Sequence, residues 1–332
     1  MYNSINMGID TIQKIINFIK QKGQVTAKEM VDEIGITRQA LFKHHLSKLL
    51  ESGIIEKRGK PPKVFYSLKE KQEPKETSFV PKEYITKIEN NFLLITPIGE
   101  EKKGADGFID WCKKNNLPIE KTAQEYVDVL SKYEKYREDG FINGTEKFKN
   151  SFKKVFLDKV FYLDFYSIER FGKTKLGQIL FYAKNSQDKR LIKELVLEIK
   201  PKIEKIIKEF NIDGVAFVPP TVKREVQLMK ELEKNLKLKT RVVKISKIKT
   251  NISIPQKSLK KIEDRIENAE KTMSVEENTI FSNILLIDDA IGSGATLNEI
   301  SKKIRQKGIC QNKIIGLAII GSFKGFDVIS EV

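Results

Sequence analysis

Two carboxylates and a loop of small residues stand together in residues 284–296, which read ILLIDDAIGSGAT. Asp288 and Asp289 follow four apolar residues, and a loop with Ser293 and Thr296 then leads into a helical pattern. Free backbone N–H groups at a helix start bind phosphate, and the two hydroxyls add donors. The carboxylates would repel a lone phosphate, so they fit sugar hydroxyls that donate hydrogen bonds, or a magnesium ion held through water. The sequence thus predicts a site for a phosphorylated ligand.

Alternating strands and helices surround this stretch from about residue 160 onwards. Strands are expected at 215–218, 241–245, 284–287 and 314–320, and helices at 191–210, 223–236 and 295–307. Such alternation predicts an α/β domain in which helices cover both faces of a parallel sheet. Ligands bind such sheets at the carboxyl ends of the strands, where the two aspartates are expected to lie.

Residues 284–296 match every position of the signature with which type I phosphoribosyltransferases bind PRPP (5-phosphoribosyl 1-diphosphate). Three further segments resemble the ComF-like members of that family. Residues 182–188 resemble a lysine-containing turn, residues 218–224 a pyrophosphate-binding loop, and residues 256–269 a Gln…Arg…Asn segment in a flexible loop. The resemblance covers about residues 160–332 and implies a type I phosphoribosyltransferase fold for this part of the chain.

The resemblance also implies a role for each matching residue. Asp288 and Asp289 would bind the ribose hydroxyls and act in catalysis, together with Arg265. This arginine or a neighbouring lysine of the flexible loop would close over the pyrophosphate. PRPP would also contact Ala290, Gly292, Ser293, Gly294, Ala295, Thr296, Pro220, Thr221, Lys223 and Arg224. Mg²⁺ would be the cofactor, carried by PRPP and held near Asp289 through water, without a direct protein ligand. The four-cysteine zinc element that often precedes the ComF-like domain is absent from the sequence.

The first 70 residues are predicted to form three helices and a β-hairpin. Apolar residues at 9, 12, 15, 16 and 19 follow the helix period, Thr26 and Glu29 suggest a capping box, and Thr37 caps a third helix that ends near Ser52. Strands at 54–56 and 64–68 flank a basic turn. This pattern closely resembles the winged helix-turn-helix DNA-binding domains of bacterial and archaeal regulators.

In such a domain the third helix enters the major groove, and the hairpin reaches the adjacent backbone or the minor groove. Arginine and glutamine can read base edges, whereas lysine more often meets phosphate. The predicted contacts to double-stranded DNA are Thr37, Arg38, Gln39, Lys43, His44, Lys48, Lys57, Arg58, Lys60 and Lys63. Two-fold DNA sites predict a homodimer. A winged helix used only for protein contact is the alternative, but the basic hairpin and Arg38 favour DNA.

Between these parts, residues 71–83 are expected to be a linker, and residues 84–159 a helical spacer or hood. The expected domains are therefore 1–70, 84–159 and 160–332. Helices are predicted near 107–115, 122–136 and 143–155, and a strand at 92–96. The aromatic residues of this region are interpreted as core, with stacking of nucleobases as the alternative; they are Trp111, Phe148, Phe152, Phe156, Phe161 and Phe165.

The charge and its distribution along the chain favour functions that bind anions. The 332 residues carry 61 Lys and Arg against 45 Asp and Glu, a net charge of +16. Residues 1–71 hold 13 basic and 7 acidic residues, residues 175–332 hold 30 and 20, and the residues between hold 18 of each. This distribution favours two anion-binding modules around a neutral middle, with a lysine-rich solvated surface as the alternative.

The compartment is predicted from three features. No apolar run approaches the roughly 20 residues of a membrane span, and the N-terminus lacks the pattern of a secretion signal. Cys112 and Cys310 are too far apart in sequence for a zinc knuckle and give no disulfide framework. We therefore expect a cytoplasmic protein with no membrane partner.

Three functions are compatible with this sequence. The first is a transcriptional regulator with PRPP or a related nucleotide as effector, which the lack of an obvious nucleobase-binding residue favours. The second is an active phosphoribosyltransferase, a pentosyltransferase that releases pyrophosphate, targeted to DNA or a partner by its winged helix. A closable basic loop at residues 246–282 favours this second function. The third is an accessory protein of DNA processing.

Overall fold

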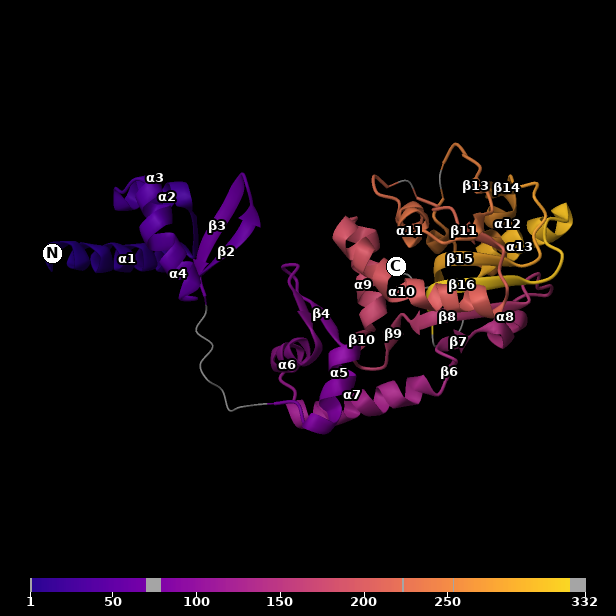
Figure 1. Cartoon of the computed structure of the whole chain (residues 1–332), viewed down its shortest axis with the longest axis horizontal. Helices are drawn as coiled ribbons and strands as arrows, with labels where there is room; N and C mark the ends of the chain where they lie inside the picture. The colour runs from indigo at the N-terminus through magenta and orange to yellow at the C-terminus, as the bar shows by residue number, and fades with distance from the viewer. Residues whose placement is uncertain (1, 70–78, 223, 253, 323–332) are drawn as a thin grey trace. The chain divides into compact units, whose positions relative to one another are not determined.

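The computed structural model describes residues 2–69, 79–222, 224–252 and 254–322. The chain divides into two compact units, Met1–Thr77 and Ser78–Val332. The division falls within the expected linker, most of which lies outside the described residues. Residues 84–159 and 160–322 belong to the same unit, so the expected spacer does not form a separate body. Figure 1 shows the elements of each unit in chain order.

The N-terminal unit contains the predicted helices and hairpin. Its three-stranded antiparallel sheet has the order β1-β3-β2. Its elements are α1 (Tyr2–Lys22), β1 (Gln24–Thr26), α2 (Ala27–Ile34), α3 (Arg38–Ala40), the π-helical segment η1 (Leu41–Leu46), α4 (Ser47–Glu51), β2 (Ile55–Lys60) and β3 (Lys63–Leu68). The apolar faces of these elements meet in one core.

Local hydrogen bonds explain where these helices begin. The predicted capping box is present, because the Glu29 amide donates to Thr26 Oγ1 at 3.3 Å and the Thr26 amide donates to Glu29 Oε2 at 2.6 Å. Thr37 Oγ1 accepts from the Ala40 amide at 3.2 Å. The third helix differs from the expected α-helix at η1. Its i→i+5 bonds place Leu41 and Leu46, both fully buried, on one face.

The C-terminal unit is built on a seven-stranded sheet with the order β12-β11-β15-β16-β8-β7-β6. The first five strands pair in parallel, whereas β7 pairs antiparallel with β8 on one side and with β6 on the other. The strands are β6 (Arg137–Glu138), β7 (Phe141–Asn143), β8 (Lys159–Phe165), β11 (Gly214–Phe217), β12 (Arg241–Val242), β15 (Ile284–Ile291) and β16 (Ile314–Gly321). The predicted α/β architecture with a largely parallel sheet is therefore confirmed.

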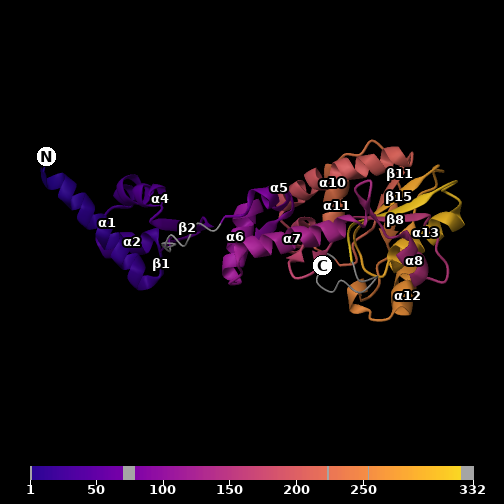
Figure 2. The ribbon, with the colours of Figure 1, turned by 90° about the horizontal axis from the view of Figure 1, so that it is seen from below.

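Helices cover both faces of this sheet, and Figure 2 shows α10 (Lys189–Glu209) and α13 (Ala295–Lys307) on opposite sides of it. Alternate residues of β15 explain the two layers. Ile284 and Leu286 pack in the core that contains Ile300 of α13. Leu285 and Ile287 pack in the core that contains the apolar face of α10. The four apolar residues before the aspartates thus hold the strand between two helical layers.

The middle region is less purely helical than expected. It contains α5 (Lys82–Asn91), β4 (Leu93–Ile95), β5 (Glu101–Lys103), α6 (Gly104–Lys114), α7 (Ile119–Glu134) and α8 (Thr145–Ser151), and it supplies β6 and β7 to the main sheet. The strand expected at 92–96 is present as β4, whereas β5, β6 and β7 were not predicted, because strands of two or three residues carry little periodic signal. Phe148, Phe161 and Phe165 are buried and Trp111, Phe152 and Phe156 partly buried, which supports the core interpretation.

Several elements near the two aspartates differ from expectation. Helix α11 (Leu228–Leu236) begins five residues later than predicted. The expected strand at 241–245 is divided, because β12 joins the main sheet whereas β13 (Ile245–Lys247) pairs with β14 (Met273–Val275). Residues 246–282 are not one loop, since they contain the 3₁₀ turn η2 (Gln256–Ser258) and α12 (Ile262–Thr272). Among the described residues, no helix has the length and apolar character to cross a bilayer.

Candidate functional site

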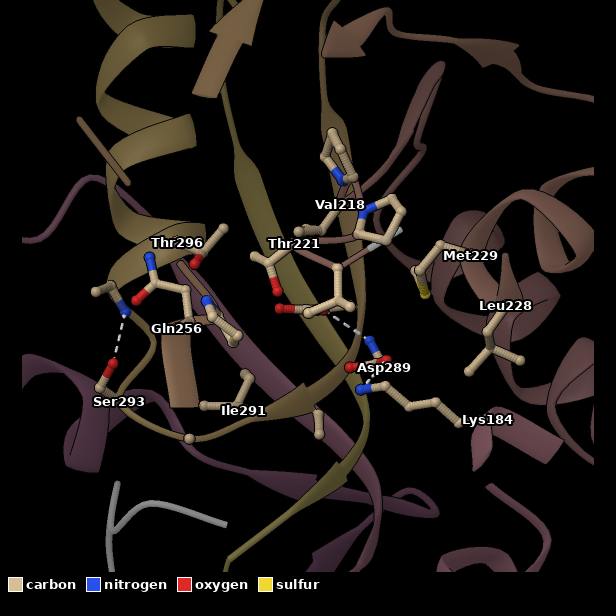
Figure 3. A pocket seen from close by; sticks show the side chains of 18 of the residues that line it. Lys184, Val218, Thr221, Leu228, Met229, Gln256, Asp289, Ile291, Ser293 and Thr296 are labelled. Carbon is tan, nitrogen blue, oxygen red and sulfur yellow. Dashed lines mark hydrogen bonds and ion pairs between the residues drawn. The ribbon is translucent and has the colours of Figure 1, made fainter. Parts of the chain in front are cut away.

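A pocket lies at the carboxyl ends of β11 and β15 (Figure 3). These strands are parallel neighbours, with Gly214 opposite Ile284 and Phe217 opposite Ile287, so the segments that follow them meet at one edge of the sheet. The structure brings together the following predicted site residues: Pro220, Thr221, Arg224, Arg265, Asp288, Asp289, Ala290, Gly292, Ser293, Gly294, Ala295 and Thr296. Lys223, also predicted, lies outside the described residues.

The two aspartates lie inside a strand rather than after it. Strand β15 continues to Ile291 and pairs with β16 along this length, whereas β11 ends at Phe217, so the carboxylates project beyond the end of β11. Asp288 Oδ1 accepts from the Asp289 amide at 2.8 Å. Burial, and then repulsion by Asp289, raise the pKa of Asp288 to about 7. The pair therefore holds less than two full negative charges near neutral pH.

Lys184 also belongs to this site, although no role for it could be predicted from the sequence. It lies in the last helical turn of α9 (Lys175–Ser186) and not in a connecting turn as the resemblance implied. Its Nζ stands 2.7 Å from Asp289 Oδ2 (Figure 3). Both side chains are largely buried, with 24% and 15% of their surfaces exposed. The only signal in the sequence was the family-like stretch 182–188. The contact itself joins residues more than a hundred positions apart.

We expect Lys184→Met to lower the melting temperature. The substitution leaves the Asp289 carboxylate without its counter-charge beside Asp288, and breaking a buried pair in this way costs about 3–5 kcal/mol. Partial exposure of both groups lowers this figure. Thermal unfolding at pH 7.5 measures the loss. The double variant Lys184→Met with Asp289→Asn should recover most of it, and a double variant as unstable as the single one would contradict this account.

The loop of residues 292–294 leads directly into α13 and leaves its N-terminus uncapped. Among the described residues no side chain caps this helix, and the Ala295 amide makes only a long 3.4 Å bond to Ser293 Oγ. Gly294 has φ +79°, and a Cβ at this position would stand 2.4 Å from the Phe148 ring. Asn298 fixes the other side, because it donates to the Lys154 carbonyl and accepts from the Phe156 amide, both at 3.0 Å. The geometry suits an anion at the start of α13.

The loop after β11 is fastened to the end of α9. The Arg224 guanidinium donates to the Lys184 carbonyl and, at 3.3 Å, to Asn185 Oδ1. The Val226 amide donates to Gln187 Oε1 at 2.7 Å. Arg224 therefore lines the pocket, but its guanidinium donates hydrogen bonds to the end of α9, which favours a role in positioning the loop. Thr221 lies in the same loop, and the Thr221 carbonyl accepts a hydrogen bond from Lys247 Nζ at 3.4 Å.

Arg265 is not on a flexible loop, which corrects the expectation that it closes over a ligand. It lies in α12 with 4% of its surface exposed, and its Nε donates to the Leu259 carbonyl at 2.8 Å. Its Nη1 is 3.6 Å from the point where a Cβ on Gly292 would stand, and its Nη2 has no partner among the described residues. Burial lowers its pKa. A buried cation with a spare donor therefore lies next to the loop of residues 292–294.

Gln256 is a second lining residue that joins this set. Its Nε2 donates to the Arg265 carbonyl at 3.1 Å and to Asn268 Oδ1 at 3.3 Å. Gln256 thus links Arg265 and Asn268, so the three residues of the Gln…Arg…Asn segment at 256–269 are joined beside the pocket. Within the described residues there is no cluster of three or more His, Cys, Asp or Glu side chains that could hold a metal ion. The carboxylate oxygens of Asp288 and Asp289 are the available metal ligands, and two carboxylates suit a cation that a ligand already carries.

All ten predicted DNA-contact residues of the N-terminal unit are exposed. Arg38 lies with its guanidinium carbon 5.8 Å from the centre of the Phe42 ring, and Arg58 pairs with Glu56. His44 is exposed, whereas His45 is partly buried, and burial lowers its pKa. The exposed set carries cations on both the third helix and the hairpin.

No family model matches the chain, and no curated protein matches it. The ligand of the pocket therefore has to be inferred from the residues that form it.

Proposed function

We propose that this protein is a DNA-binding transcriptional regulator whose C-terminal unit has a type I phosphoribosyltransferase fold and binds PRPP or a related phosphorylated nucleotide as effector. The observation that carries the proposal is the pocket of Figure 3. Segments around residues 184, 220, 256 and 290 each resemble a segment of the family, those at 220 and 290 being its pyrophosphate loop and its PRPP signature, and all four line this one pocket. Unrelated resemblances would have no reason to converge in space.

In this proposal the ligand lies along the loop of residues 292–296. Its 5-phosphate accepts from the backbone N–H groups at the start of α13 and from the hydroxyls of Ser293 and Thr296. Its ribose hydroxyls donate to Asp288 and Asp289, and its pyrophosphate lies toward Thr221. Mg²⁺ bound to the pyrophosphate neutralises part of its charge and reaches Asp289 through water.

The pocket favours an effector role over turnover because of what lines it. Its described lining contains three basic side chains, Lys184, Arg224 and Arg265, and the two aspartates as its ionisable groups. The same described lining includes no aromatic ring on which a nucleobase could stack. A sensor needs only to bind PRPP differently in two conformations, whereas a transferase must also hold and activate a base.

The N-terminal unit supplies the DNA-binding half of the proposal. We expect Arg38→Ala to weaken binding to a selected DNA sequence about tenfold or more, since a bidentate contact to a base is worth about 1–3 kcal/mol. Lys28→Ala, at an exposed lysine of α2 outside the predicted contacts, is the matched control. Fluorescence anisotropy at fixed salt measures both. Equal losses in the two variants would leave only general charge attraction and would contradict specific readout.

An active phosphoribosyltransferase is the second candidate, and the linked set of Gln256, Arg265 and Asn268 favours it. These residues keep the family-like segment ordered beside the pocket, where Arg265 adds positive charge. In this candidate, carboxylates near the ribose stabilise an oxocarbenium-like state while pyrophosphate leaves. Release of pyrophosphate from Mg-PRPP with a panel of nucleobases tests it. Base-dependent release that Asp288→Asn abolishes would replace the effector role with catalysis.

A further inference from the structure

A second cavity lies in the C-terminal unit, and it shares no lining residue with the pocket at β15. Its volume is about 700 Å³, within the range of roughly 300–1,000 Å³ that small-molecule sites occupy. It is bounded by α5, α7, the end of β8, the first turn of α9 and the middle of α10. The cavity is therefore large enough for a ligand with more than one chemical part.

The described lining of the cavity holds more basic than acidic side chains, with Lys87, Lys135, Arg137, Lys175 and Lys202 against Glu134, Asp164 and Glu198. Arg137, Lys175 and Lys202 line it, and so does the N-terminus of the 12-residue helix α9, where Thr174 Oγ1 accepts from the Gly177 amide at 3.0 Å. Two of the cations are already paired. Arg137 binds Asp164, with its Nη1 on the Leu163 carbonyl at 2.8 Å, and Lys175 lies 2.6 Å from Glu198.

Lys202 is different, because its ammonium group makes no hydrogen bond or ion pair within the described residues. It is partly buried, and this burial lowers its pKa, with the nearby Asp164 acting in the opposite direction. Taking an ammonium group out of water without a partner costs free energy. An anionic group of a ligand placed between Lys202 and the start of α9 would offset that cost.

Aromatic side chains also line the cavity. Tyr126, Tyr133 and Phe165 line it, and the rings of Tyr133 and Phe165 meet edge to face with their centroids 5.1 Å apart. Asn90 and Asn91 also line the cavity, and Asn91 Nδ2 donates to the Lys87 carbonyl at 2.8 Å. The three aromatic side chains are largely buried, and a flat ring with polar edges would cover what remains exposed of them and form hydrogen bonds at its rim.

We propose that this second cavity binds a nucleoside monophosphate. The phosphate lies at Lys202, Lys175 and the N-terminus of α9, and the base lies against Tyr126, Tyr133 and Phe165. This site does not rest on the proposed PRPP site, since the two are lined by different residues. A regulator with two nucleotide sites could respond to a product as well as to a precursor.

Equilibrium dialysis of the full chain with labelled AMP as the probe tests this proposal. We expect one saturable site whose affinity falls at least tenfold in Lys202→Met, which keeps the length of the side chain but removes its charge. Lys208→Met, at an exposed lysine in the last turn of the same helix, is the matched control and should bind AMP normally. The Asp288→Asn/Asp289→Asn protein should also bind AMP normally.

Three outcomes would overturn the proposal. The first is no saturable AMP binding by the wild-type protein, and the second is equal affinity in wild type and Lys202→Met. The third is loss of AMP binding in the Asp288→Asn/Asp289→Asn protein, which would place AMP in the first pocket. Inorganic phosphate that competes as well as AMP would overturn the aromatic half of the site. Lys202→Met removes an unpaired ammonium group, so its melting temperature should equal or exceed that of the wild type, which keeps the comparison valid.

Discussion

Replacement of Asp288 and Asp289 together by asparagine is expected to weaken Mg-PRPP binding at least a hundredfold while the protein stays folded. Hydrogen bonds to charged groups contribute about 1.5–3 kcal/mol each, so the loss of two corresponds to about 3–6 kcal/mol. Each 1.4 kcal/mol is about a tenfold change in affinity. Titration calorimetry with Mg-PRPP measures the effect. Asp128→Asn, at an exposed carboxylate of α7, is the control and should bind as the wild type does.

The single variant Asp288→Asn is also expected to raise the melting temperature at pH 8. Burial and the neighbouring Asp289 raise the pKa of Asp288 to about 7, well above its value in the unfolded chain. Ionisation of this carboxyl therefore opposes folding as the pH rises above the unfolded value, and the opposition is complete above about pH 7. Asparagine mimics the protonated form of Asp288. The increase in melting temperature should therefore be present at pH 8 and absent below about pH 4. A lower melting temperature at pH 8 would contradict the account.

The second large effect is expected at Gly294. Alanine there must adopt φ +79° and would place a Cβ 2.4 Å from the Phe148 ring, so the loop before α13 has to move. We expect PRPP binding to fall at least tenfold, because the N–H groups at the start of α13 would no longer converge on a phosphate. The melting temperature should also fall, because strained backbone and a steric clash in the core act together.

Gly308→Ala provides a matched control for this variant. Gly308 ends the same helix with φ +69°, but apart from its chain neighbours no atom of the described residues lies within 4 Å of the place where its Cβ would stand. Its replacement carries only the strain of the left-handed conformation, about 1–2 kcal/mol. Binding of PRPP should be unaffected in Gly308→Ala. If both glycine variants bound PRPP equally well, the loop of residues 292–294 would not be the phosphate site.

Features encoded by neighbouring residues could be predicted from the sequence. The capping box of Thr26 and Glu29 needs only the spacing of two residues, and both of its hydrogen bonds are present. The run of apolar residues before Asp288 likewise predicted a strand buried on both faces, because no polar residue interrupts it. Parallel pairing of β11 and β15 then places the segments that follow them at one edge of the sheet, as expected for a ligand site.

Features that depend on distant residues could not be predicted in this way. Arg265 was expected on a flexible loop, but its buried position follows from the fold of α12 beside the loop of residues 292–294. The pairing of Lys184 with Asp289 joins α9 to β15, and the guanidinium of Arg224 is occupied by the end of α9. The short strands β6 and β7 gain their hydrogen bonds from the edge of the sheet rather than from their own propensity.

Ligand-dependent DNA binding is the central claim, and one titration tests it most directly. Fluorescence anisotropy would follow the full-length protein binding to a DNA sequence selected by the protein itself, at fixed salt, with and without Mg-PRPP. The account predicts that Mg-PRPP changes the DNA affinity several-fold in the wild type and has no effect in the Asp288→Asn/Asp289→Asn protein. Sequence-specific binding with the same affinity in the presence and absence of Mg-PRPP would contradict it.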